Sequence, residues 1–140
     1  MGELATGPAY AWQGVDRPTP AVELNWRANE HTLSPYITIT GLPQTGSGFV
    51  AVGVSYRTTW RRLYWMSGLG IGVPIGARER REFGSAGVFN LDGAVGFQAT
   101  PRIGIEAFSA HWSNGSILRI YKAWPDVGLD EAGIRLRVRY

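Results

Sequence analysis

The sequence contains no cysteine, few charged residues and no long apolar segment. The absence of cysteine excludes disulfide bonds, zinc sites with thiolate ligands and cysteine nucleophiles. No stretch reaches the roughly 18 consecutive apolar residues that a transmembrane helix needs. The longest weakly polar run, 66–77, is interrupted by five glycines or prolines and one serine. A closed β-barrel also satisfies every backbone hydrogen bond in lipid, with a much weaker sequence signal.

Charged residues make up 18% of the 140 residues and hydrophobic residues 44%, with 19 glycines. This is less charge than the surface of a soluble domain usually carries. The net charge of +3 is mild, and we expect no nucleic-acid partner. The length predicts a single domain over residues 1–140. No secretory signal peptide is recognisable, so we expect an exported form to be a mature chain with an added start methionine.

Apolar and polar residues alternate along most of the chain, as they do in half-buried strands. In the last segment, 132–140, three residues oppose the apolar face: Arg135, Arg137 and Arg139. Such a row is prohibitive inside a soluble sandwich, whereas in a barrel with a polar interior it can pair with acids of the lumen. Tyr140 ends the chain in phase with the apolar face, which resembles the C-terminal signal of bacterial outer-membrane proteins.

We predict eight strands, at about 5–12, 20–28, 35–41, 48–57, 62–74, 87–99, 102–114 and 129–140. Eight strands make the smallest membrane barrel. The predicted fold is therefore an all-β, eight-stranded antiparallel transmembrane β-barrel. Its lumen is expected to hold an ion-pair network of these residues: Glu23, Asp92, Glu106, Arg27, Arg62, Arg102, Arg135, Arg137 and Arg139.

A soluble ligand-binding barrel is the alternative, and it would turn its apolar face inward. The opposite face would then be the solvated exterior, and its richness in glycine and alanine argues against this. A designed or heavily altered barrel is a further possibility. The sequence does not distinguish a monomer from a homodimer.

The connections predict how the barrel is oriented in a bacterial outer membrane. We expect periplasmic turns at 29–34, 58–61 and 100–101, and extracellular loops at 13–19, 42–47, 75–86 and 115–128, with both termini in the periplasm. Two of the loops carry basic residues: Arg78, Arg80, Arg81, Arg119 and Lys122. Arginine binds phosphate through two hydrogen bonds, so these loops are candidates for contact with phosphates of the outer leaflet. A merely solvated loop tip explains 77–82 equally well.

Of the two histidines, His31 falls in a predicted turn, where a solvated role is expected. His111 is different, because the alternation of its strand places it and Ser113 on the lipid-facing side. Polar groups there are costly and usually have a function. Residues i and i+2 of a strand lie about 6.5–7 Å apart at Cα, within reach of a hydroxyl-to-imidazole hydrogen bond.

A serine nucleophile needs such a base and a third group that orients it. The apolar phase of the last strand, followed back from Tyr140, brings Asp130 to the outer face near the extracellular end. Asp130 then lies beside His111 if the last two strands pair. Glu131 points the other way.

These residues carry a family resemblance. Ala110-His111-Trp112-Ser113-Asn114, followed by Pro125-Asp126-Val127-Gly128-Leu129-Asp130, resembles the motifs of the PagL-type lipid A 3-O-deacylases. Gly68 to Val73 looks like the family's glycine-rich fifth strand, and Phe89-Asn90-Leu91 looks like its sixth. The similarity covers about residues 66–140.

The resemblance implies Ser113 as nucleophile, His111 as general base and then acid, and Asp130 as the orienting carboxylate. It implies hydrolysis of the acyl chain at the 3-position of lipid A, in lipopolysaccharide of the outer membrane, with no metal or cofactor. The expected substrate contacts are Phe89, Asn114, Gly115 and Arg119.

The sequence departs from the family pattern in three places. The acid is aspartate where the family has glutamate, the loop 115–124 is longer, and Asp126 replaces the family's asparagine. Donors that follow Ser113 would then stabilise the oxyanion. A noncatalytic barrel of the same descent is accordingly kept as an alternative.

Overall fold

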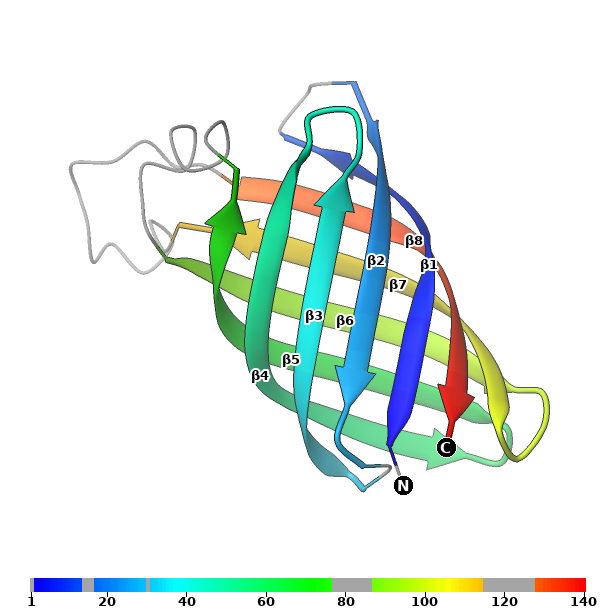
Figure 1. Ribbon diagram of the computed structural model, residues 1–140. Coiled ribbons are helices and arrows are strands. Elements are labelled where there is room, and N and C mark those ends of the chain that lie inside the picture. The colour runs from blue at the N-terminus through cyan, green and yellow to red at the C-terminus, as the bar shows by residue number, and fades with distance from the viewer. Residues whose placement is uncertain (1, 14–16, 30, 77–86, 115–127) are drawn as a thin grey trace.

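The computed structural model describes residues 2–13, 17–29, 31–76, 87–114 and 128–140. These ranges contain eight strands: β1 (Glu3–Trp12), β2 (Thr19–Arg27), β3 (Leu33–Leu42), β4 (Ser47–Trp60), β5 (Leu63–Ile75), β6 (Val88–Gln98), β7 (Ile103–Ser113) and β8 (Gly128–Arg139). Each strand pairs antiparallel with the next, and β1 also pairs with β8, so the sheet closes into a barrel (Figure 1). The predicted eight-stranded antiparallel barrel is confirmed. Within the described ranges, no helix is long and apolar enough to cross a membrane.

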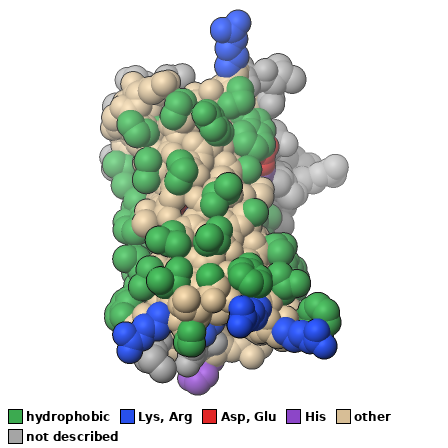
Figure 2. Space-filling model, turned by 90° about the vertical axis from the view of Figure 1, so that its right-hand side faces the viewer, with side chains coloured by type: hydrophobic (Ala, Val, Ile, Leu, Met, Phe, Trp, Pro, Cys, Tyr) green, Lys and Arg blue, Asp and Glu red, His purple; other side chains and the backbone are tan. Residues whose placement is uncertain are grey.

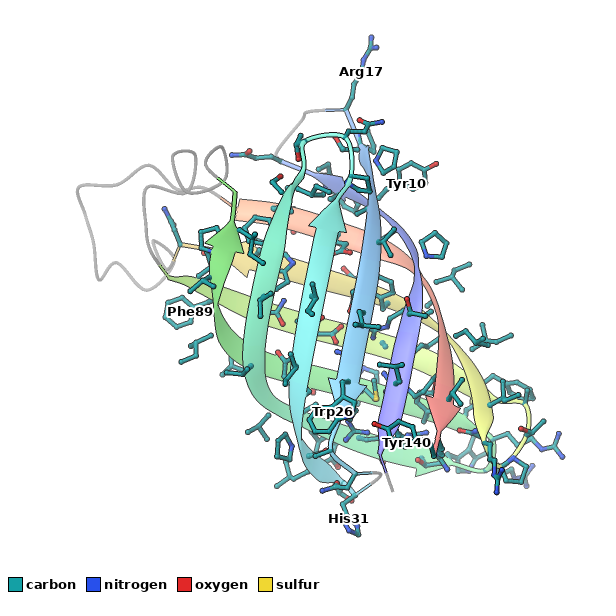
Figure 3. The ribbon with its side chains drawn as sticks, in the orientation of Figure 1. Tyr10, Arg17, Trp26, His31, Phe89 and Tyr140 are labelled. Carbon is teal, nitrogen blue, oxygen red and sulfur yellow. The ribbon has the colours of Figure 1, made fainter. Side chains whose placement is uncertain are left out.

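The barrel has two different ends. The β2–β3, β4–β5 and β6–β7 connections and both chain termini lie at one end, which we call the turn end (Figure 1). The β3–β4 connection lies at the opposite end, which we call the loop end. His31 is exposed in the β2–β3 connection at the turn end, as predicted (Figure 3).

The predicted turn at 58–61 is wrong in its bounds. Residues 58–60 belong to β4, because Thr58 pairs with Trp65 and Trp60 pairs with Leu63. The chain reverses only at Arg61, whose φ is 57°, and Arg62. Thr58 and Thr59 are β-branched, and such residues suit an extended strand.

The apolar side chains point outward. Val52, Leu69 and Ile134 are 52%, 61% and 60% exposed, and hydrophobic side chains cover the height of the barrel in Figure 2. Such a surface suits hydrocarbon rather than water. The soluble ligand-binding barrel required the opposite arrangement, so that alternative is wrong.

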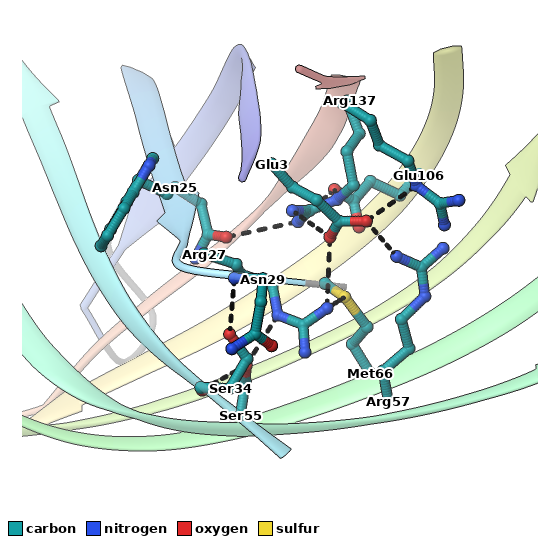
Figure 4. A network of polar contacts seen from close by, with 12 residues as sticks. Glu3, Asn25, Arg27, Asn29, Ser34, Ser55, Arg57, Met66, Glu106 and Arg137 are labelled. Atoms are coloured by element: carbon teal, nitrogen blue, oxygen red, sulfur yellow. Dashed lines mark hydrogen bonds and ion pairs between the residues drawn. The ribbon is translucent and has the colours of Figure 1, made fainter. Parts of the chain in front are cut away.

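The lumen holds a dense network of ion pairs instead of an apolar core. Glu3 contacts four arginines near the turn end, at 3.2, 2.6, 3.4 and 2.9 Å respectively: Arg27, Arg57, Arg137 and Arg139 (Figure 4). Further along the axis, Arg135 contacts three acids: Glu23, Asp92 and Glu106. These buried charges are tolerated because each is paired.

The predicted ion-pair network of the lumen included two residues that lie elsewhere and left out others. Arg62 and Arg102 are exposed, because they lie in connections and not in the strands to which the sequence assigned them. Glu3 and Arg57 are also buried in the lumen, although the predicted network did not include them. The first of these was missed because β1 begins at Glu3, two residues before the predicted strand.

Candidate active site

The candidate site lies on the outer wall, where β7 and β8 approach the loop end. His111 and Asp130 are directly opposite each other in the register of these two strands. The imidazole Nδ1 lies 2.7 Å from the Asp130 Oδ1, a hydrogen-bond distance. Their side chains are 31% and 46% exposed, so the pair is accessible from outside the barrel.

Gly128 provides the space in which the imidazole lies. A Cβ atom at this position would be 2.9 Å from the His111 Cε1 and 3.4 Å from its Nε2. Gly128 pairs with Ser113, two residues beyond the pair of His111 and Asp130. Nδ1 faces Asp130, and Nε2 therefore lies on the other side of the ring, toward Gly128 and its partner Ser113.

Ser113 is the last residue of β7, and strand alternation places it on the same wall as His111. Ser113 is only 4% exposed and is therefore buried, whereas the sequence predicted a serine that faces lipid. Across the sheet it pairs with Phe89 of β6, which is half-buried and projects from the wall in Figure 3. Phe89 therefore borders the position of the predicted nucleophile.

Trp112 anchors the same segment from the inner side of the wall. Its side chain is fully buried and stacks on Phe49 with ring centroids 5.0 Å apart. Its indole N–H donates to Glu131 Oε2 at 3.4 Å, and Thr40 donates to the same oxygen at 2.7 Å. Glu131 thus points into the lumen, as its parity predicted, and does not replace Asp130.

The remaining predicted site residues are only partly described. Asn114 follows β7 directly and is buried. Gly115 and Arg119 lie outside the described residues, and so do the other basic loop residues: Arg78, Arg80, Arg81 and Lys122. Among the residues that the structure describes, no three acid or histidine side chains are arranged to hold a metal ion.

The supporting roles of Gly128 and Trp112 were not predicted from the sequence. Gly128 lies in the segment that carries the family resemblance. Its role depends on the imidazole of the neighbouring strand, which occupies the space that a side chain at this position would need. Trp112 alternates with His111 and Ser113, and this alternation is the signal that would have placed it in the lumen.

The closed sheet, apolar exterior and charged lumen define the chain as an eight-stranded transmembrane β-barrel. No family model matches the sequence, and no curated protein matches it either. Among solved structures, the chain is similar to the outer membrane enzyme PagL, with 16% identity, a TM-score of 0.65 and 99% of each chain covered.

Two other structures have a similar level of likeness. Neisserial surface protein A has 13% identity and a TM-score of 0.63, over 99% of this chain and 96% of the other. A de novo designed transmembrane β-barrel has 10% identity and a TM-score of 0.60, over 98% and 95%. At these identities the likeness establishes the fold alone.

Proposed function

We propose that this protein is a bacterial outer-membrane serine esterase that removes the ester-linked acyl chain at the 3-position of lipid A. The observation that carries the proposal is the hydrogen bond between His111 and Asp130 on the outer wall. A polar pair on this wall is costly in lipid, and among the described residues neither side chain is hydrogen-bonded to a side chain of the lumen. The motif around Ser113 supports the same reaction, and the structural neighbour PagL is an outer membrane enzyme.

The chemistry follows from the orientation of the imidazole. Asp130 accepts a hydrogen bond from the Nδ1–H group, which leaves the lone pair of Nε2 free to take the proton of the Ser113 hydroxyl. The Ser113 oxygen then attacks the ester carbonyl, and the tetrahedral intermediate expels the sugar oxygen as the imidazolium returns the proton to it. Water hydrolyses the acyl-serine by the same steps and releases the fatty acid.

Oxyanion stabilisation requires hydrogen-bond donors close to the nucleophile. Asn114 is the described residue next to Ser113, and it is buried. We assign it and the backbone that follows Ser113 to this function. Phe89, across the sheet from Ser113, is proposed to contact the acyl chain.

The direct test is lipid A from a strain that lacks other deacylases, analysed by mass spectrometry with and without expression. We expect the wild type to remove one 3-linked acyl chain and Ser113→Ala to remove none. Ser109→Ala is the matched control, since Ser109 lies on the same exposed face of β7 but outside the pair, and it should retain activity. Unchanged lipid A with a folded wild-type barrel would contradict the proposal.

A noncatalytic barrel is the second candidate, and the burial of Ser113 favours it. A nucleophile must be reached by its substrate, so a permanently enclosed serine would be inactive. This candidate expects no hydrolysis of lipid A or of any simple ester in detergent. Ester hydrolysis that depends on Ser113 would exclude it.

A further inference from the structure

A cluster of exposed positive charge lies at the turn end, away from the candidate active site. Arg61 and Arg62 form the β4–β5 turn, and Arg102 precedes β7. All three side chains are exposed and have no ion pair among the described residues. The strand acids near this end, Glu3 and Glu106, are buried in the lumen and already bind other arginines.

Backbone hydrogen bonds join these two turns to each other and to the end of β8. The Gln98 N–H donates to the Arg62 carbonyl at 2.7 Å, which joins the two turns. The Arg139 N–H donates to the Arg102 carbonyl at 2.8 Å. Thr100 Oγ1 accepts hydrogen bonds from the N–H groups of Arg102 and Ile103, at 3.3 and 3.0 Å.

An exposed apolar row runs across the sheet immediately before the cluster. It consists of residues paired in sequence from β4 to β7: Trp60, Leu63, Phe97 and Ile105. Trp60 is 67% exposed, and the Arg61 guanidinium lies 5.2 Å from the centre of its ring. Aromatic side chains of this kind mark the boundary between hydrocarbon and headgroups.

Arginine or lysine side chains lie just beyond the hydrophobic surface at this end in Figure 2. They are therefore at the height of lipid phosphates when the apolar row is in hydrocarbon. At that height, guanidinium groups without an ion-pair partner bind phosphate oxygens through paired hydrogen bonds.

We propose that Arg61, Arg62 and Arg102 form a binding site for the phosphate of an anionic phospholipid in the leaflet at the turn end. The site is independent of the proposed esterase activity, because it lies at the opposite end of the barrel. An anionic lipid is favoured over a zwitterionic one, since the cluster has no described acid on its surface to neutralise it.

The test uses the full chain folded into phosphatidylcholine vesicles that contain a trace of spin-labelled lipid. The fraction of motionally restricted label is compared for phosphatidylglycerol and phosphatidylcholine. We expect the wild type to prefer phosphatidylglycerol, and R61Q/R62Q/R102Q to lower that preference by about threefold. Sodium chloride at about 1 M should weaken the wild-type preference, because the charges are exposed.

Arg17→Gln is the matched control, because Arg17 is an exposed arginine at the loop end (Figure 3). It should leave the preference unchanged. R61K/R62K/R102K keeps the charge but not the paired geometry, and an intermediate preference is expected. Migration of unheated samples on gels reports folding of each variant.

The proposal is overturned if the glutamine triple variant keeps the wild-type preference, or if Arg17→Gln lowers it equally. Binding of the wild type to peptidoglycan, without any preference for phosphatidylglycerol, would assign the cluster to a different partner and would also overturn it. Loss of deacylation in a Ser113 variant has no bearing on this outcome, so the two proposals fail separately.

Discussion

The length of the acid beside His111 decides how well the imidazole is oriented. Asp130 reaches Nδ1 at 2.7 Å although it is one methylene shorter than the glutamate of the family that it resembles. We expect Asp130→Asn to lower kcat by about 10²-fold or more, because the amide no longer stabilises the imidazolium. Asp130→Glu should retain most activity. Rates on a soluble ester in detergent measure both, and an active Asp130→Asn enzyme would show that the acid is not used.

The space beside the His111 imidazole is also limited, because it exists only while residue 128 has no side chain. Gly128→Ala puts a methyl group 2.9 Å from the His111 Cε1, so the ring must leave the position in which it is hydrogen-bonded to Asp130. We expect kcat to fall at least about tenfold, because a displacement of about 1 Å is enough to disturb catalysis, and the pH dependence of kcat to change. Gly41→Ala is the control, since its Cβ would meet only the Val22 carbonyl oxygen at 3.8 Å. Equal activity in both variants would remove Gly128 from the site.

At the scale of the strand, inward glycines make room for two tyrosines of the lumen. Tyr36 packs over glycines of β4 and β5, and Tyr64 faces Gly96 directly across β5 and β6. A Cβ at Gly96 would be 2.1 Å from the Tyr64 Cζ. The tyrosine cannot easily retreat, because its ring also packs against Arg57, whose guanidinium carbon lies 3.9 Å from the ring centre.

We therefore expect Gly96→Ala to lower the free energy of unfolding by about 1–3 kcal/mol through overpacking. Gly93→Ala lies in the same strand but meets nothing closer than 3.9 Å, so it should have little effect. Urea unfolding in lipid vesicles compares the two. A stability loss at Gly93 as large as that at Gly96 would indicate a general intolerance of β6 and not contact with Tyr64.

For the whole molecule, charge is divided along the axis of the lumen. Arginines predominate near the turn end, around Glu3 and Glu106, whereas acids predominate toward the loop end, around Arg135. Glu3 is the centre of the basic half. Glu131, in the acidic half, accepts hydrogen bonds from Thr40 and Trp112 but forms no ion pair within the described chain.

Because of this division, we expect the two buried glutamates Glu3 and Glu131 to contribute unequally to the free energy of unfolding. Glu3→Gln leaves several buried arginines without their acid, and we expect a loss of about 3–5 kcal/mol in the free energy of unfolding. Glu131→Gln keeps an acceptor for both hydrogen bonds and removes no ion pair, so its effect should be small. Urea titrations of both variants in vesicles decide this, and equal losses would contradict the division.

The sequence by itself determined the alternation of every strand, because a period of two follows directly from extended backbone. It therefore predicted the closed barrel, the outward apolar face, and Asp130 rather than Glu131 as the acid on the outer wall. It did not determine where strands end: Arg62 and Arg102 were assigned to the lumen but are exposed in turns. Strand ends depend on pairing with a neighbour, which local composition does not encode.

Only the tertiary structure decided the register of β7 against β8, and with it the contact between His111 and Asp130. A shift by two residues would preserve every inward and outward face yet separate the two side chains by about 7 Å. The fit of the imidazole over Gly128 and the burial of Ser113 depend on the same register. They are properties of neighbouring strands together, so neither strand's sequence contains them alone.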